Sequence, residues 1–215
     1  MRRFLRYNGL TVVLLSCFLL SWAAQSLAGY RREWNDSLEH GEAPDSYSEY
    51  LRSDRFWEAT AENWESEFFQ MFMYVALTAV LYQKGSAESK DPDKPDDLPP
   101  PITPDSPWPA RRGGWILKIY SHSLSLAFCA FFLVAFAIHA LAGGKAYNHE
   151  LRLHGQPEIP LLSYLATSQF WYESFQNWQS EFLAITAMVY LSIYLREKSS
   201  PESKPVQMPH RQNPE

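Results

Sequence analysis

The sequence FWEATAENWESEF at Phe56–Phe68 is the clearest guide to the fold, because a second version of it, FWYESFQNWQSEF, occupies Phe170–Phe182. The two stretches lie 114 residues apart, and at this offset Phe4–Lys90 aligns with Lys118–Lys204 without a gap. Of the 87 aligned pairs, 26 are identical. A gapless match of this length predicts that one structural unit has been duplicated in tandem.

Each repeat contains a long and a short apolar segment. The long one in the first repeat is uncharged for about 20 residues, which is enough for a helix to cross a bilayer. The short ones need about one more helical turn, so we expect their spans to begin near Asn63 and Asn177, with Glu65, Glu67 and Glu181 at the outer headgroups. The predicted fold is an all-α membrane protein with four transmembrane helices in two tandem hairpins and short amphipathic helices at the outer interface. The expected spans are residues 10–29, 63–83, 117–142 and 177–196.

A cleaved signal peptide is the alternative for the first span, since it follows the basic start MRRFLR and small residues occur near Ala28. The third apolar segment cannot be such a signal, and the first is its counterpart in the repeat. We therefore expect Leu10–Gly29 to be a retained helix. The resulting organisation is repeat 1 over residues 1–85, a linker over 86–114, repeat 2 over 115–198 and a tail over 199–215, with outer loops over 30–62 and 143–176.

The distribution of charge predicts the orientation. Of the 19 Lys and Arg residues, 13 lie near the N-terminus, in the middle linker or in the tail, which predicts that these three parts are cytoplasmic. The two outer loops and the helix starts that follow them carry a charge of −9 and the rest of the chain +4, which together give the net charge of −5. Such a charge balance argues against a general nucleic-acid binder. With only two cysteines, Cys17 and Cys129, a disulfide scaffold or a four-cysteine zinc site is excluded.

The linker is rich in proline, with 8 of the 15 prolines between Gly85 and Gly114. Proline lacks the N–H group that helices and sheets need, so an extended and disordered cytoplasmic tether is predicted there. A polyproline recognition segment is the alternative. The tail after Lys198 is also predicted to be disordered.

Two Asn–Glu pairs are the candidate polar site. Asn63 and Glu67 share a helix face at i, i+4, and Asn177 and Glu181 repeat the arrangement. Across a pseudo-two-fold axis along the membrane normal, the two carboxylates would share a proton or bind a cation. Alternatively, the glutamates cap exposed N–H groups at the wet rim of the membrane.

Aromatic residues and caps mark the outer ends of the spans. Ser46 and Glu49 form a capping-box pattern, and a further helix start is expected at Ser53 or Asp54. Four tryptophans recur at helical spacing and predict an aromatic belt at the outer interface, with an aromatic binding groove as the alternative. They are Trp57, Trp64, Trp171 and Trp178.

The histidines give weaker signals. His40 and His154 precede glycine in both repeats, which is typical of a turn; a metal pair is the weak alternative. His122 and His139 lie 17 residues apart on the third span, too far to hold one metal, although axial ligation of two haems is conceivable. We predict no cofactor and no catalytic residue, because the sequence contains no phosphate-binding glycine loop, nucleophile elbow or zincin spacing.

The sequence resembles an uncharacterised family of small bacterial inner-membrane proteins, a domain of unknown function. The motifs that carry the resemblance are YNGL at Tyr7–Leu10, EHGE at Glu39–Glu42, the run Tyr50–Phe68 with FWEATAENWESEF, and KGSAESKD at Lys84–Asp91. The resemblance implies a bacterial source and a location in the cytoplasmic membrane, and it carries no activity or site residue with it.

Two functions follow as hypotheses. The first is a non-enzymatic scaffold, partner subunit or envelope-associated factor, whose partners are the lipid bilayer and a second copy of the chain or another membrane protein. The alternative is a small proton- or cation-handling transporter or channel that uses the paired Asn and Glu positions. A membrane enzyme or haem carrier ranks third.

Overall fold

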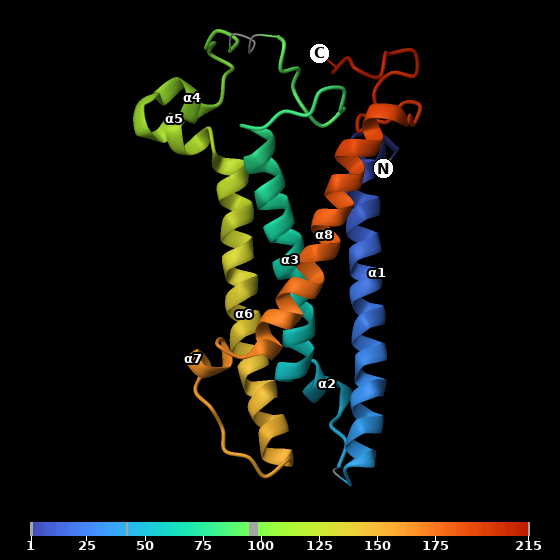
Figure 1. Ribbon diagram of the computed structural model, residues 1–215, viewed down its shortest axis with the longest axis vertical. Coiled ribbons are helices and arrows are strands. Elements are labelled where there is room, and N and C mark those ends of the chain that lie inside the picture. Colours follow the sequence, from blue (N-terminus) through green and yellow to red (C-terminus); the bar gives the residue numbers. More distant parts are fainter. Residues whose placement is uncertain (1, 42, 95–98, 215) are drawn as a thin grey trace.

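The computed structural model describes residues 2–41, 43–94 and 99–214, and every regular element in these ranges is a helix (Figure 1). This confirms the all-α fold class. Glu42 of the EHGE motif and residues 95–98 of the linker lie outside the described residues. The helices are α1 (Arg2–Glu39), α2 (Tyr47–Tyr50), α3 (Asp54–Thr78), α4 (Trp108–Arg112), α5 (Gly114–Tyr120), α6 (Ser123–Leu153), α7 (Leu161–Tyr164) and α8 (Ser168–Tyr194).

The four long helices run between two ends of the molecule. The loops that carry α2 and α7 lie at one end, which we call the loop end (Figure 1). Both termini, the linker and the helices α4 and α5 lie at the other, which we call the termini end (Figure 1). The chain therefore runs down α1, up α3, down α6 and up α8.

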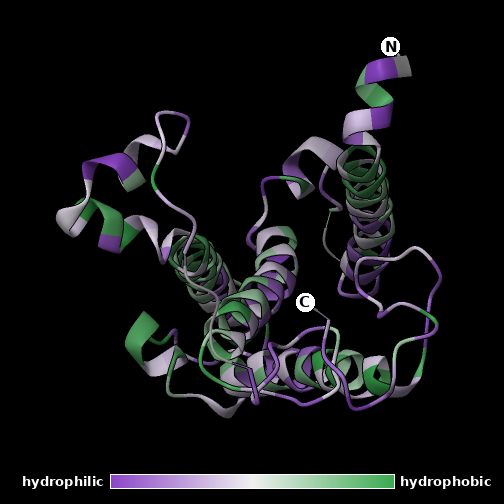
Figure 2. Cartoon of the chain, turned by 90° about the horizontal axis from the view of Figure 1, so that it is seen from above, coloured by the Kyte–Doolittle hydropathy of each residue, from purple (hydrophilic) through white to green (hydrophobic). Residues whose placement is uncertain are grey.

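The centre of the molecule is the contact between α3 and α6, the most closely packed pair of helices. Small residues allow this close approach: Ala61 on α3 and Ala135, Ala142 and Gly143 on α6 are all buried. Without bulky side chains between them, the two backbones can pack tightly, as is common for helices in membranes. Viewed along the bundle, α1 is set apart from the other long helices (Figure 2).

Helix α1 contacts α3 mainly through aromatic rings. The ring of Trp22 stacks on Phe56 with 6.2 Å between the centroids and lies 5.6 Å from Trp64. The second repeat has the same kind of contact, since Phe136 of α6 meets Phe170 of α8 at 5.5 Å. These contacts hold the helices of each hairpin together at a distance set by large side chains.

The helix starts at the loop end follow the capping signals. Ser46 and Glu49 form the expected capping box of α2. The side chain of Ser53 accepts a hydrogen bond from the backbone N–H of Phe56 and begins α3, and Thr167 begins α8 in the same way. Both helices therefore begin about nine residues before the expected spans, which places Asn63 and Asn177 well inside a helix.

The boundaries at the termini end differ from the expected ones. Helix α3 ends at Thr78, before the expected limit of residue 83. The third predicted span is divided between α5 and α6, with Ser121 and His122 outside either helix. The hydroxyl of Ser121 donates to the carbonyl of Leu117 at 2.7 Å, a local bond with which serine competes with regular helical bonding.

The linker and the tail, for which the sequence predicts disorder, meet at the termini end. The buried side chain of Asn213 donates to backbone carbonyls of the segment after α3, and its Oδ1 accepts from the N–H of Gly85 at 2.7 Å. These carbonyls belong to Gln83, Ser86, Ser89 and Lys90, at 2.8–3.3 Å. The tail is thereby attached to the chain where the first repeat passes into the linker.

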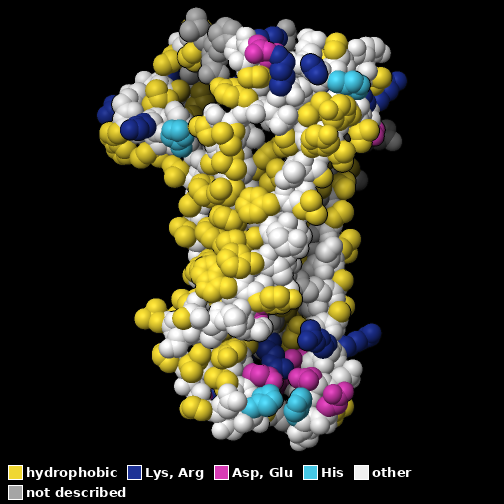
Figure 3. Space-filling view, in the orientation of Figure 1, with side chains coloured by type: hydrophobic (Ala, Val, Ile, Leu, Met, Phe, Trp, Pro, Cys, Tyr) yellow, Lys and Arg dark blue, Asp and Glu magenta, His cyan; other side chains and the backbone are white. Residues whose placement is uncertain are grey.

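The middle of the molecule presents apolar side chains outward. Figure 3 shows a hydrophobic band over the central part and acidic, basic and histidine side chains gathered at the two ends. Helices α1 and α6 are long enough and apolar enough to cross a membrane. Of the residues in the most apolar stretch of each helix, only 6% in α1 and 17% in α6 are buried. Exposing an apolar surface of this extent to water is unfavourable, so a lipid or protein surface is the environment that suits it.

Candidate functional site

The most deeply buried polar contact joins α3 to α6 near the loop end. Nδ1 of His139 lies 2.6 Å from Oε2 of Glu65, and both side chains are almost fully buried. An ionised carboxylate can only accept a hydrogen bond, so Nδ1 carries the hydrogen of this pair. Burying such groups is unfavourable unless each is paired, so the two residues depend on each other.

A second carboxylate approaches the same imidazole from α8. Oε2 of Glu173 lies 3.5 Å from Nε2 of His139, an ion-pair distance that is too long for a hydrogen bond. Nε2 is accordingly a buried nitrogen without a hydrogen-bond partner. His139 thus sits between two glutamates and has one nitrogen free to take up or release a proton.

Aromatic groups surround this histidine. Phe170 stacks on the imidazole with 4.9 Å between the centroids. The indole Nε1 of Trp178 donates to Oε1 of Glu65 at 3.2 Å, and the hydroxyl of Tyr164 donates to Oε2 of Glu173 at 3.3 Å. These rings exclude water and fix the two carboxylates around the imidazole. We call Glu65, His139 and Glu173 the histidine–glutamate cluster.

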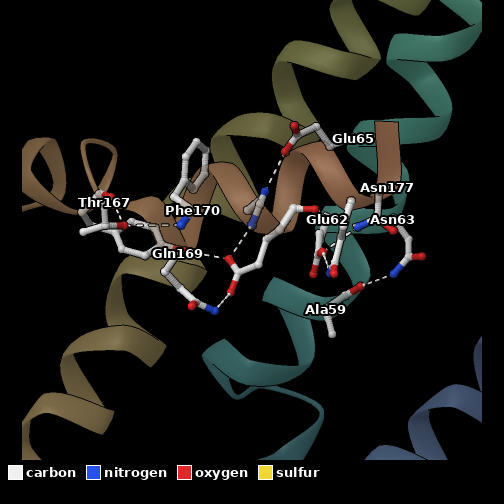
Figure 4. A network of polar contacts seen from close by, with 12 residues as sticks. Ala59, Glu62, Asn63, Glu65, Thr167, Gln169, Phe170 and Asn177 are labelled. Atoms are coloured by element: carbon white, nitrogen blue, oxygen red, sulfur yellow. Dashed lines mark hydrogen bonds and ion pairs between the residues drawn. The ribbon is translucent and has the colours of Figure 1, made fainter. Parts of the chain in front are cut away.

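Two further glutamates of α3 lie next to the cluster. Glu62 accepts hydrogen bonds from the amides of Gln176 and Asn177 on α8 (Figure 4). Oε1 of Glu58 lies beside Gly143 of α6, at 3.0 Å from the point that a Cβ would occupy. Four carboxylates therefore surround one histidine, so the group has more acid than base unless protons or cations bind.

Glu58 and Glu173 lie outside the predicted spanning segments, and their carboxyl groups respond differently to this crowding. Burial raises the pKa of Glu58 to about 7, and the negative charge of Glu173 adds to the effect, against the attraction of His139 and Arg55. Burial also acts on Glu173, but the ion pair with His139 and the hydrogen bond from Gln169 outweigh it and lower its pKa. Glu58 is thus the carboxyl group that changes its charge near neutral pH.

The backbone around the cluster is held by local features of the sequence. Thr167 caps α8, so that Phe170 and Glu173 lie on its first turns and face α6. Gly143 has no side chain, and the hydroxyl of Tyr164 comes within 2.4 Å of the point that a Cβ would occupy. The same contact occurs 114 residues earlier between Gly29 and Tyr50, at 2.0 Å.

The predicted Asn–Glu site is only partly brought together. Asn63 is exposed and donates to the carbonyl of Ala59 in its own helix, as Figure 4 shows. Asn177 instead joins Glu62 at 2.5 Å. The carboxylates of Glu67 and Glu181 lie close enough to repel each other, but Glu67 is exposed and Glu181 is half-buried. The four residues therefore do not form a single buried cluster.

The four predicted tryptophans form two pairs, one in each repeat. Trp57 and Trp64 contact each other and Trp22 of α1, whereas Trp171 and Trp178 contact each other with the same centroid distance of 6.4 Å. Trp178 has a polar role in addition, through its bond to Glu65. Whether they form a belt at a membrane interface stays a prediction.

His40 and His154, the candidate metal pair, have local roles. Nδ1 of His40 lies 2.9 Å from the carbonyl of Asp36, and Nδ1 of His154 is equally close to that of Glu150. Each is followed by a glycine with positive φ, which is typical of a helix end. Within the described ranges, no group of three or more His, Cys, Asp or Glu residues could hold a metal ion.

The symmetric Asn–Glu pairs of the sequence do not predict the histidine–glutamate cluster. The counterparts of Glu65, His139 and Glu173 in the other repeat are Gln179, Gln25 and Ala59, so repeat symmetry hides the cluster. One signal was present: between Ser123 and Leu141, His139 is the single residue with a basic or acidic side chain. An ionisable residue in an apolar segment is a functional candidate by default.

Comparisons with known proteins identify the family of the chain. Neither the curated proteins nor the solved structures include one that matches this chain. A family model matches residues 1–215 in full. The chain therefore belongs to the family described as a domain of unknown function (DUF6766).

Proposed function

We propose that this chain is a proton-handling integral membrane protein and that the histidine–glutamate cluster is its proton-binding site. The observation that carries the proposal is the position of His139, which is wholly buried between Glu65 and Glu173 with Nε2 lacking a hydrogen-bond partner. Protonation of Nε2 gives the imidazole a positive charge flanked by two carboxylates. Binding one proton therefore changes the charge of a site from which water is excluded.

The membrane part of the proposal rests on surface chemistry. Helices α1 and α6 could each cross a bilayer, and their apolar faces are exposed. The loops lie at one end of the molecule and both termini at the other, as four spans with a cytoplasmic N-terminus and C-terminus require. We accordingly place the chain in a cytoplasmic membrane with the loop end outside.

Proton binding explains the acid excess of the site better than a purely structural role does. A buried ion pair contributes little net stability compared with apolar residues of the same volume. One carboxylate is enough to pair with a histidine that has only a structural role. His139 has two such partners, and Glu58 and Glu62 bring the number of nearby carboxylates to four. Binding and releasing a proton converts no substrate into a product. We therefore propose that the chain is not an enzyme.

The experiment is a histidine titration in nanodiscs, followed by ¹⁵N NMR, with the His139 signal assigned from its loss in His139→Gln. We expect Nε2 to titrate reversibly. In Glu65→Gln the midpoint should move to lower pH by one unit or more, because a negative partner is lost. Glu67→Gln, an exposed glutamate of the same helix, is the matched control and should leave the midpoint in place. An imidazole with one unchanging state from pH 4 to pH 10 would refute the proposal.

A second candidate is a partner-binding role, favoured by the exposed apolar face of α1. Leu10, Leu14 and Leu20 are 60–75% exposed, and Cys17 is exposed on the same helix. If a second copy covers this face, oxidation in native membranes should crosslink Cys17 to its counterpart, whereas Cys129 should not react in this way. A monomer after oxidation at all protein densities argues against a homodimer through α1.

A further inference from the structure

The side chains that separate His139 from the loop end differ in polarity from those that separate it from the termini end. On the loop-end side, α3 and α6 carry charged residues in successive turns. A cleft of about 450 Å³ opens there, with Asp54 and Arg55 of α3 facing Lys145 and Asn148 of α6 in its lining. This cleft lies between the first turns of α3 and the last turns of α6, where charged side chains gather (Figure 3).

Glu58 lies one helical turn from the cleft towards the cluster. Its Oε1 and the hydroxyl of Tyr164 both come within 3.0 Å of one point above Gly143, so the two oxygens are neighbours. The same hydroxyl contacts Glu173, which faces Nε2 of His139. Polar oxygens therefore lead from the cleft to the unpartnered nitrogen.

On the termini-end side, aromatic rings close the site. Phe69 of α3 follows Glu65 by one turn, and its ring lies 5.0 Å from Phe132 of α6. On the other side it meets Trp178 and Phe182 of α8, at 4.5 and 5.7 Å. We call these four residues the aromatic layer. The three phenylalanine rings of the layer carry no hydrogen-bonding group, and the indole N–H of Trp178 is already bonded to Glu65, so the layer offers a proton no onward polar step.

From this asymmetry we infer that protons reach His139 from the loop end alone, through the cleft and Glu58, while the aromatic layer closes the opposite side. The inference rests on the proposed proton-binding function and adds its route and direction. A proton from bulk water binds the Glu58 carboxylate, moves to Glu173 and then to Nε2 of His139. Each carboxylate regains its charge as it passes the proton on, so the site gains one positive charge in total.

The groups that face this route come from every neighbouring element. Around Glu58 they are Arg55 and Glu62 on α3, His139 on α6 and Glu173 on α8. Around His139 they are Glu62 and Glu65 on α3 and Glu173 on α8, with Tyr164 of α7 bonded to Glu173. Since Glu58 joins the cleft to the cluster without touching His139 at hydrogen-bond distance, it acts as a relay and not as a part of the binding pair.

The test uses the full chain in proteoliposomes sorted by orientation, with perfusion infrared difference spectra recorded after pH jumps. The imidazole band is assigned by its loss in His139→Gln. We expect the band to respond promptly when the loop end faces the perfusate and at least tenfold more slowly when the termini end does. Equal responses in both orientations would overturn the inference.

Two variants make the test specific. Glu58→Gln should slow the response from the loop end at least tenfold while His139 still titrates reversibly, whereas Glu67→Gln should change neither the rate nor the midpoint. Phe69→Ala should make the band respond from the termini end as well. Unchanged rates in Glu58→Gln would contradict the relay.

The outcomes also separate the two proposals. A His139 band that titrates in detergent but shows no sidedness refutes the route and leaves the proton-binding function standing. A band that never titrates refutes the proposed function itself.

Discussion

The two repeats are built alike at the loop end and differ in charge one turn further in. In both, a glycine of the first long helix touches the hydroxyl of a tyrosine from the short helix, as Gly29 with Tyr50 and Gly143 with Tyr164. The tyrosine then packs on a phenylalanine with 5.5 Å between the centroids in either repeat. This frame is independent of charge.

Within the same frame, the second repeat carries His139 where the first carries Gln25, and Glu65 on α3 corresponds to Gln179 on α8. The ionic pair lies at the tight contact of α3 and α6, whereas Gln179 is exposed and bonds within its own helix. The comparison teaches that a duplicated scaffold can carry a buried charged pair at positions where its other copy has two neutral glutamines. A search for function should therefore look for positions at which the repeats disagree.

The largest effect is expected from separating the buried pair. Glu65→Ala should lower the free energy of unfolding by about 3–5 kcal/mol, because it leaves a buried imidazole without its partner. Gln179→Ala, at the corresponding position, should change it by less than about 0.5 kcal/mol. Thermal unfolding in detergent, followed by circular dichroism, measures both.

The double variant Glu65→Gln/His139→Gln is the control, because it places at both positions the neutral residue found at the corresponding position of the other repeat. Replacing both members of a buried pair is far less costly than removing one. We therefore expect most of the lost stability to return. A double variant as unstable as Glu65→Ala would show that the charges themselves hold α3 to α6.

The next effect concerns pH and Glu58, whose counterpart in the other repeat is the neutral Tyr172. The pKa of Glu58 in the fold, about 7, lies above the ordinary value of 4.5. Its stabilising contribution is therefore complete below about pH 4.5 and is lost as the pH rises through about 7, by about 3 kcal/mol in total. In Glu58→Gln the unfolding temperature should fall less over this range; parallel curves for both proteins would contradict the shifted pKa.

A smaller effect is expected at the two glycines. Gly143→Ala places a methyl group against the hydroxyl of Tyr164 and should cost about 1–3 kcal/mol, and Gly29→Ala should behave alike against Tyr50. Adding Tyr50→Phe to Gly29→Ala should recover stability. Adding Tyr164→Phe to Gly143→Ala should recover less, because that hydroxyl also serves Glu173 and because Glu58 crowds the same point. Equal rescue would mean that the two tyrosine hydroxyls are equivalent.

The smallest effect distinguishes the two short helices. Ser46 caps α2 through a full capping box, whereas the corresponding residue of α7 is Pro160, which has no side-chain hydrogen bond. Ser46→Ala should cost about 1 kcal/mol of stability. An increase in amide hydrogen exchange limited to α2 is the expected signature, and exchange that rises throughout α3 would contradict a local role.

Much of the helical fold follows from local signals in the sequence. The capping box at Ser46 and the helix start at Ser53 appear as expected, because a cap depends on residues three or four positions apart. The C-terminal end of α3 and the break before α6 were not predicted, since they depend on where the chain meets other segments. Ser121, at the break before α6, gives no signal in the sequence, because serines also occur inside uninterrupted helices.

The site was harder to predict for a different reason. Asn63, Glu67, Asn177 and Glu181 are repeated in the sequence, but a repeat shows which residues are alike and not which face one another. The contact of Glu65 with His139 depends on the packing of α3 against α6, between residues 74 positions apart. The isolated histidine in an apolar segment was the one local hint, and it does not name its partner.

Asn213 has a consequence for how the molecule can move. Its single side-chain amide links the chain just after α3 to a segment beyond α8, through one accepted and four donated contacts. The two hairpins are therefore linked at the termini end by hydrogen bonds as well as by the chain itself. A movement of one hairpin against the other that opened the aromatic layer would have to strain or break these hydrogen bonds. Access of protons to His139 from the termini end is therefore coupled to the contacts of Asn213.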